Sequence, residues 1–416
     1  MAWTDEVLVA ESTRRYLADT VRVWLGVRNA DAPLPELPVD LARSLLRLQE
    51  HEHGERDPWG GWPASAAGAS LRRAGIDHWV SCVRRELPSE LSLEPRWPPG
   101  KGFVVCLTHD VDLLGTRLTP AQAFRHARAG LAAGVSSRGE FVARLLRPAV
   151  RITRATGSGL SLAPSLHDTL ERVLELESAY GAKASFFFTV PPHAPRSRYD
   201  CVYAPGDRCL FRGRRLQVAD VMRAIAGEGF DVGLHGGYAS GLESGVLTDE
   251  RATLETATGL EIRTTRQHFL RWDVRCTPRY QEAAGLRADA SMGFNFDVGY
   301  RAGTSLPFRL FDIELGTPLD VIEVPLVAQD GAILGPSGLG LSEPVASRLL
   351  RDLVDATAAC EGVLTLLFHP DKLVRPEWLA LFERLLERAA EQGAWMTSLG
   401  ELNSWWRTRE ARILAA

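Results

Sequence analysis

The sequence of 416 residues contains only three lysines, at positions 101, 183 and 372, among its 48 basic residues. Arginine therefore supplies almost all of the positive charge, which we attribute to codon usage rather than to function. The net charge at pH 7 is −4, and so small an excess indicates neither a nucleic acid nor a membrane surface as the partner.

Long apolar runs and paired cysteines are also missing. No stretch approaches the 18 or more apolar residues of a membrane span, and the first seven residues lack the basic start and apolar core of a signal peptide. The six cysteines are scattered without a CxxC pair. Cys201 and Cys209 flank a Pro-Gly turn and could be bridged, but without a secretion signal we expect free thiols. We expect a cytoplasmic protein with no transmembrane segment.

The composition, 45% hydrophobic and 24% charged, is that of an ordinary globular protein. We divide the chain into a mostly helical N-terminal region, 1–99, that packs on a barrel at 100–416. Apolar periodicity predicts helices over 12–24 and 41–49, separated by a proline-rich stretch. A basic helical insertion is expected at about 117–157, because 117–154 holds eight arginines and one acid, Glu140. A solvated arginine face is the favoured interpretation; an anionic substrate or membrane is the alternative.

Residues 50–63 form a separate feature of the N-terminal region. His51 and His53 alternate with carboxylates and could bind a metal, but their spacing and the Gly, Pro and Trp residues that follow favour an ordered loop. Trp59 and Trp62 could stack on a sugar face, although packing is the default role for tryptophan.

The stretch 103–112, FVVCLTHDVD, predicts a short buried strand that ends in two carboxylates, Asp110 and Asp112. A continuous apolar run between Pro-Gly and Gly breaks is typical of a central parallel strand. Carboxylates at the end of such a strand occupy the position where α/β folds carry their chemistry.

Beyond this strand, helical and strand-like stretches alternate regularly. Strands are expected at 184–190, 230–235, 261–266, 286–290, 321–327, 363–368 and 394–397. Helices are expected at 165–180, 217–227, 247–257, 278–284, 343–360 and 376–392, with a last one reaching about 412. About seven βα units with right-handed crossovers predict a closed or nearly closed parallel barrel, a distorted (β/α)7-type fold.

Polar residues follow these strands where each one ends, and the ends meet at one mouth of a barrel. The residues are Asp110, Asp112, His235, Arg266, His268, Asp330 and His369. A purely structural explanation for three histidines, three aspartates and an arginine on one face is poor, so we expect a functional site.

Four of these stretches, in this order, resemble the motifs of the NodB-homology polysaccharide deacetylases (carbohydrate esterase family 4). They are Asp110–Asp112, 233–238 (GLHGGY), 265–272 (TRQHFLRW) and 367–370 (LFHP). The segments 290–293 and 300–303 are similar to those of a variant bacterial subgroup with an N-terminal extension. The resemblance covers about 103–400 and implies a NodB-like barrel that removes acetyl groups from carbohydrates.

The resemblance also implies roles. Asp110 would be the general base, Asp112 and His235 metal ligands, Arg266 the residue that orients Asp110, and His369 the general acid. Asp330 is placed to pair with His369. The same reaction follows from residue chemistry, because amide hydrolysis needs a Lewis acid such as Zn²⁺, a base for water and an acid for the amine.

One position departs from the family pattern, because Ala239 stands where the second motif usually supplies another histidine. His268 is the best replacement as third ligand; its alternative role is a hydrogen bond to Asp110 or substrate. His109 is less suitable because strand alternation turns it away. A degenerate glycan-binding barrel and a glycoside hydrolase using Asp110 and Asp330 remain open. The expected substrate is an N-acetylated carbohydrate, nucleotide- or lipid-linked.

Overall fold

The computed structural model describes residues 3–67, 73–114, 166–191, 197 and 199–415. The basic helical insertion predicted at about 117–157 lies outside the described residues. Among the described helices, none has both the length and the apolar character needed to cross a bilayer. All six cysteines are free thiols, as expected.

A single curved sheet forms the centre of the barrel, in the order β10-β11-β1-β2-β5-β6-β7-β9-β8, with β12 beside β1. Its ladders are parallel except for the antiparallel pair β8–β9. The strands are β1 (Val104–Val111), β2 (Ser185–Phe188), β5 (Asp231–Gly236), β6 (Thr264–Gln267), β7 (Ala288–Asp289), β8 (Phe308–Asp312), β9 (Thr317–Glu323), β10 (Leu326–Gln329), β11 (Val363–Leu367) and β12 (Trp395–Thr397). A separate hairpin pairs β3 (Arg208–Phe211) with β4 (Arg214–Gln217).

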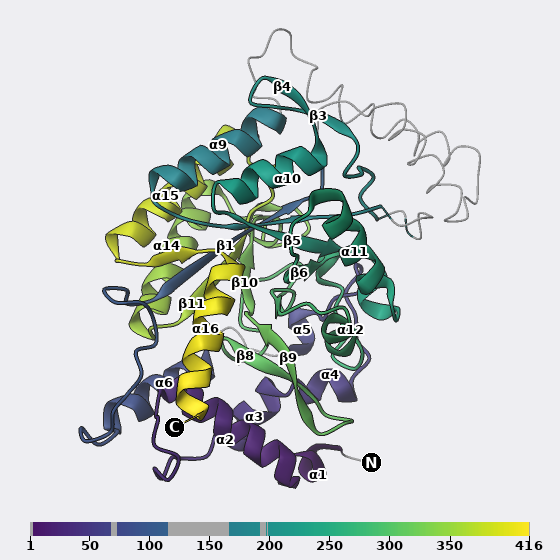
Figure 1. Cartoon of the computed structure of the whole chain (residues 1–416). Helices are drawn as coiled ribbons and strands as arrows, with labels where there is room; N and C mark the ends of the chain where they lie inside the picture. The colour runs from purple at the N-terminus through teal and green to yellow at the C-terminus, as the bar shows by residue number, and fades with distance from the viewer. Residues whose placement is uncertain (1–2, 68–72, 115–165, 192–196, 198, 416) are drawn as a thin grey trace.

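Helices surround this sheet, and those of the N-terminal region lie together at the end remote from the β3–β4 hairpin (Figure 1). The N-terminal helices are α1 (Trp3–Val9), α2 (Glu11–Leu25), α3 (Val39–Leu45), α4 (Leu48–Glu52), α5 (Ala64–Ala67) and α6 (Gly75–Glu86). The barrel carries α9 (Leu166–Ala179), α10 (Val218–Gly227), α11 (Val246–Thr258), α12 (Thr277–Ala283), α13 (Asp330–Leu334), α14 (Glu343–Ala359), α15 (Pro376–Glu391) and α16 (Leu399–Leu414), with short 3₁₀ turns η2 (Ser240–Leu242) and η3 (His268–Leu270).

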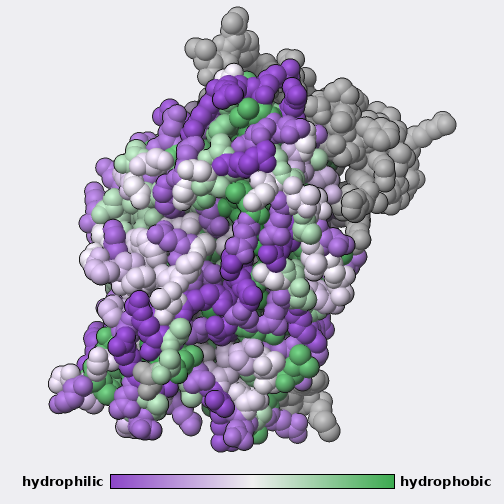
Figure 2. Space-filling model, viewed as in Figure 1, coloured by the Kyte–Doolittle hydropathy of each residue, from purple (hydrophilic) through white to green (hydrophobic). Residues whose placement is uncertain are grey.

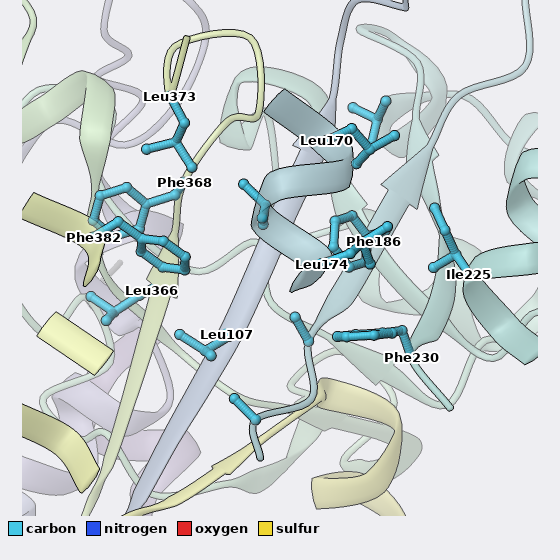
Figure 3. Packing of buried hydrophobic residues seen from close by; sticks show 14 of the residues in the cluster. Leu107, Leu170, Leu174, Phe186, Ile225, Phe230, Leu366, Phe368, Leu373 and Phe382 are labelled. Carbon is cyan, nitrogen blue, oxygen red and sulfur yellow. The ribbon is translucent and has the colours of Figure 1, made fainter. Parts of the chain in front are cut away.

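Alternation along β1 separates two hydrophobic clusters. Val105 and Leu107 pack outward with the helices, in the cluster that Figure 3 shows around Phe186 and Phe368. Val104 and Cys106 belong to the second cluster, on the opposite face of the strand. Because side chains alternate along a strand, Thr108 and Asp110 share the face of Val104 and Cys106.

The N-terminal region packs against the β8–β9 side of the barrel. Trp24 is fully buried and donates its indole N–H to the carbonyl of Pro307 (2.9 Å), while Tyr16 donates to the carbonyl of Arg309 (2.7 Å). Buried Glu50 accepts two hydrogen bonds from Arg301 (2.8 and 2.7 Å).

On the face of the molecule shown in Figure 2, hydrophilic and hydrophobic residues are interspersed. The division of the chain near residue 99 stays a prediction.

Two predicted elements are wrong in their limits. The strand expected at 321–327 is two strands, β9 and β10, at different places in the sheet, because Pro325 lies between them and cannot donate a ladder hydrogen bond. The helix expected at 41–49 is α3 and α4, separated by Arg47 in the left-handed region (φ 58°). Strands β3, β4 and β8 were not predicted.

The barrel closes imperfectly between β8 and β10. β10 and β8 are the two ends of the hydrogen-bonded order. The segment after β7 bridges part of this gap, since Leu326 donates to the carbonyl of Met292 (3.1 Å) and Gly299 to that of Val327 (3.0 Å). The expected closed or nearly closed barrel is therefore a distorted one.

Candidate metal and catalytic site

The two carboxylates at the end of β1 lie in different surroundings. Asp110 is 4% exposed, and Nη1 of Arg266 lies 3.4 Å from its Oδ1. The Asp112 side chain is 27% exposed. Asp110 is therefore the enclosed carboxylate beside a cation, and Asp112 is the accessible one.

Arg266 is held rigidly by β1 and by the segment after β7. It is fully buried, donates from Nη1 to Thr108 Oγ1 (2.6 Å) and donates from Nε to the carbonyl of Ala290 (2.8 Å). A guanidinium fixed in this way keeps a positive charge and a hydrogen-bond donor directed at Asp110.

Asp112, His235 and His268 come together at the mouth of the barrel. One ligand-type atom from each lies within 4.8 Å of the others. His235 Nε2 is 3.3 Å and His268 Nε2 is 3.8 Å from Asp112 Oδ1. Two imidazole nitrogens and a carboxylate oxygen are a common donor set for catalytic Zn²⁺.

The state of His235 shows that these residues fit a metal ion. Its Nδ1 contacts the carbonyl of Arg266 (3.0 Å), the orientation typical of a metal-binding histidine. Its Nε2 is buried and, among the described residues, makes no well-aligned hydrogen bond, with Asp112 Oδ1 at 3.3 Å as its polar neighbour. A buried polar atom without a well-aligned partner is costly, and a cation shared with Asp112 and His268 would remove that cost.

Electrostatics favour a cation at the same position. The partial enclosure of Asp112 would raise its pKa, but His268, His235 and His369 outweigh this effect and hold the pKa well below the usual range. Burial lowers the pKa of His268 to about 4, against the attraction of Asp112. His268 is therefore neutral at pH 7, the form in which imidazole binds a metal.

His369 lies on the other side of Asp112, with its Nε2 3.8 Å from Asp112 Oδ2. Asp330, the first residue of α13, accepts from His369 Nδ1 (2.8 Å) and from its backbone N–H (2.7 Å). Burial would lower the pKa of His369, but Asp330 outweighs it and raises the pKa to about 9. His369 can therefore hold a proton at neutral pH.

The remaining sequence candidates lie apart from this cluster. His109 points to the opposite face of β1, where its ring nitrogens contact the carbonyl of Phe368 (2.7 Å) and Glu177 of α9 (2.8 Å). Ala239 follows β5 and offers no donor. His53 is exposed, and His51 belongs to α4 in the N-terminal region.

Sequence reasoning missed three residues near the site. Lys372 Nζ lies 3.2 Å from Asp330 Oδ1, and its position three residues after His369 was the available signal. Thr108, in β1, accepts a hydrogen bond from Arg266 and precedes the first motif by two residues. Cys201 Sγ lies 3.8 Å from Asp112 Oδ1, and no pattern in the sequence indicated this approach.

The turn that carries His268 is strained. Phe269 (φ 58°) and Leu270 (φ 50°) are consecutive non-glycine residues in the left-handed region, a conformation that costs roughly 1–2 kcal/mol per residue. Strain of this kind persists only where the surroundings impose it, and it is concentrated at functional sites.

No protein-family model and no curated protein matches this sequence. Solved structures do match over about three quarters of the chain. The structure described as Puue allantoinase has a TM-score of 0.50 at 16% identity, covering 76% of this chain and 95% of its own. A putative polysaccharide deacetylase from Mycobacterium smegmatis has a TM-score of 0.49 at 18% identity, covering 77% and 95%. A probable polysaccharide deacetylase from Pseudomonas aeruginosa PAO1 has a TM-score of 0.46 at 14% identity, covering 77% and 95%.

The distorted (β/α) barrel predicted from the sequence is thereby confirmed. The sheet order and the match to the allantoinase structure show that this chain forms a curved, mostly parallel barrel. At these identities the likeness concerns the fold, and the chemistry must be argued from the side chains at the mouth.

Proposed function

We propose that the protein is a metal-dependent hydrolase that removes an N-acetyl or similar acyl group from a sugar or glycan precursor. The observation that carries this proposal is the convergence of the buried Nε2 of His235 on Asp112 Oδ1 (3.3 Å), with a nitrogen of His268 close to both. A base candidate and an acid candidate border the same three residues. Binding alone would require neither of them.

Asp112, His235 and His268 would hold the ion. When bound, a divalent metal such as Zn²⁺ supplies Lewis acidity to the amide carbonyl and to water. Asp110 takes the proton from the attacking water, and Arg266 keeps the carboxylate of Asp110 directed at the site. His369, held by Asp330, gives a proton to the departing nitrogen.

The surroundings of Asp330 disfavour a glycoside hydrolase that pairs it with Asp110. Asp330 is fully buried, and its two oxygens are occupied by His369 and Lys372. Burial would raise its pKa, but His369 and Lys372 hold the pKa well below the usual range. A carboxylate held ionised in this way supports a histidine rather than protonating a glycosidic oxygen.

The substrate proposed is an N-acetylated carbohydrate, nucleotide- or lipid-linked, and a cytoplasmic location is proposed with it. The fold and the donor set support amide hydrolysis, whereas the choice of carrier is drawn from the sequence alone.

Metal analysis of the purified protein tests the proposal against a degenerate glycan-binding barrel. We expect about one transition-metal ion per chain, removed by a chelator and recovered on adding Zn²⁺. A chain that binds a glycan but takes up no metal would support the non-catalytic alternative.

A further inference from the structure

A loop of the N-terminal region reaches the strained turn that carries His268. This loop, residues 56–62, is tied to the barrel by Arg56, whose Nη2 donates to Asp273 Oδ2 (2.7 Å). Within it, Asp57 Oδ1 accepts from the backbone N–H groups of Trp59 (2.8 Å) and Gly61 (2.9 Å). The loop therefore has a defined shape of its own and is fixed to the segment that follows the turn.

A stack of three aromatic rings begins in the loop and ends on the candidate metal ligand, His268. Trp59 stacks on Phe269, with ring centroids 4.9 Å apart and an interplanar angle of 20°. Phe269 stacks in turn on His268, at 4.4 Å and 19°. A side chain in the N-terminal region is thus in contact, through one ring, with the imidazole at the mouth of the barrel.

A hydrogen-bonded bridge runs parallel to this stack. Asn295 donates from Nδ2 both to Asp57 Oδ2 (2.8 Å) and to the carbonyl of Phe269 (2.8 Å). Gly60, at φ 85°, lies so close to Arg271 that an added Cβ would be 2.9 Å from Arg271 Nε. The loop therefore contacts both the strained residue and the end of the turn.

His268 needs such support because it lacks the usual kind. A metal-binding histidine normally donates its second ring N–H to a carbonyl or carboxylate, as His235 does with Arg266. Within the described part of the chain, neither ring nitrogen of His268 makes a hydrogen bond. Its orientation must therefore come from packing, and the ring stack supplies that packing.

We infer that the 56–62 loop is a positioning device for the metal site, with Trp59 and Asn295 holding the His268–Leu270 turn so that His268 faces Asp112 and His235. The inference rests on the proposed ligand role of His268. It gives the N-terminal region a function beyond stabilising the barrel, because one of its loops completes the site.

The test measures the Zn²⁺ dissociation constant of metal-free full-length protein by competition with a chromophoric chelator, and the melting temperature of the same metal-free samples. Trp59→Ala and Asn295→Leu should each weaken Zn²⁺ binding by about 10-fold or more, the usual effect of removing an outer support of a ligand. Trp59→Phe retains a ring for stacking and should recover most of the affinity.

Trp24→Phe is the matched control, since Trp24 anchors the N-terminal region to the barrel through Pro307 and takes no part in the ring stack or the Asn295 bridge. It should lower the melting temperature and leave Zn²⁺ affinity within about twofold of wild type. The inference would be overturned if Trp24→Phe and Trp59→Ala lowered the melting temperature equally and also weakened Zn²⁺ binding equally. So would unchanged affinity in both Trp59→Ala and Asn295→Leu.

Failure of the proposed function gives a different result. If the wild-type chain itself binds no Zn²⁺, the metal site is wrong and the loop has no ligand to position. If wild type binds and His268→Ala retains full affinity, the ligand role of His268 is wrong, and the loop inference fails with it.

Discussion

The ligand set depends most on His268, because Ala239 cannot supply the third protein donor that catalytic zinc sites usually have. We predict that His268→Ala and His235→Ala lower metal occupancy to a similar extent, each leaving only two protein ligands. Metal content measured after extensive dialysis checks this. If His268→Ala keeps stoichiometric metal and loses only turnover, His268 is a substrate or hydrogen-bonding residue instead.

Asp110 and His369 are expected to act on protons rather than on the metal. Asp110→Asn and His369→Ala should keep the fold and the bound metal while lowering turnover by roughly 10²–10⁴-fold. Circular dichroism, metal analysis and turnover measured on the same preparations distinguish the effects. Loss of metal in Asp110→Asn would show that the roles of Asp110 and Asp112 are exchanged, and full activity in His369→Ala would remove it as the acid.

Among the elements, β1 is central to both the packing and the site, since it pairs with β2, β11 and β12 and positions both carboxylates. Leu107 is 1% exposed on its outward face. Leu107→Ala should lower the free energy of unfolding by about 2–5 kcal/mol through lost burial and a residual cavity. Leu315→Ala, at a 66% exposed position, should change it by less than about 0.5 kcal/mol. Urea denaturation of both variants provides the comparison, and equal effects would contradict the packing described for β1.

Most elements of the barrel could be predicted because their sequences show clear periodicity between glycine and proline breaks. The strand split at Pro325 could not, because an apolar run does not show which neighbour each half pairs with. The β3–β4 hairpin was missed because Arg208, Arg214 and Arg215 make the stretch polar, so that apolar and polar residues do not alternate clearly along it. At the site, strand ends identified the residues that converge, whereas contacts across the fold, such as Trp59 on Phe269 or Lys372 on Asp330, depend on tertiary packing that no local pattern encodes.

In the whole molecule, the N-terminal region and the barrel share a buried ionic cluster. Glu50 pairs with Arg301 and Arg47, and all three are nearly inaccessible to solvent. Glu50→Gln would leave two buried guanidinium groups without a carboxylate, and removing one partner of such a cluster costs about 3–5 kcal/mol. Glu36→Gln, at an exposed position, is the control. Equal melting temperatures for Glu50→Gln and Glu36→Gln would contradict the buried contact of Glu50 with the two arginines.

Truncation tests the same interface at a larger scale. A chain starting at Pro98 would expose the surface that Tyr16 and Trp24 cover on β8 and β9. We predict that it is poorly soluble or markedly less stable than the full chain, judged by soluble yield and melting temperature. Wild-type stability and activity of this truncated chain would make residues 1–99 a detachable module.

Acetate release by the chelated and Zn²⁺-reloaded protein tests the central claim most directly. N-acetylated sugars, free, nucleotide-linked and lipid-linked, would be incubated with wild type and with Asp110→Asn. The account predicts acetate release from at least one of them by reloaded wild type, loss of release on chelation, and a roughly 10²–10⁴-fold lower rate in Asp110→Asn. Acetate release at the same rate without metal, or at the same rate in Asp110→Asn, would contradict the account.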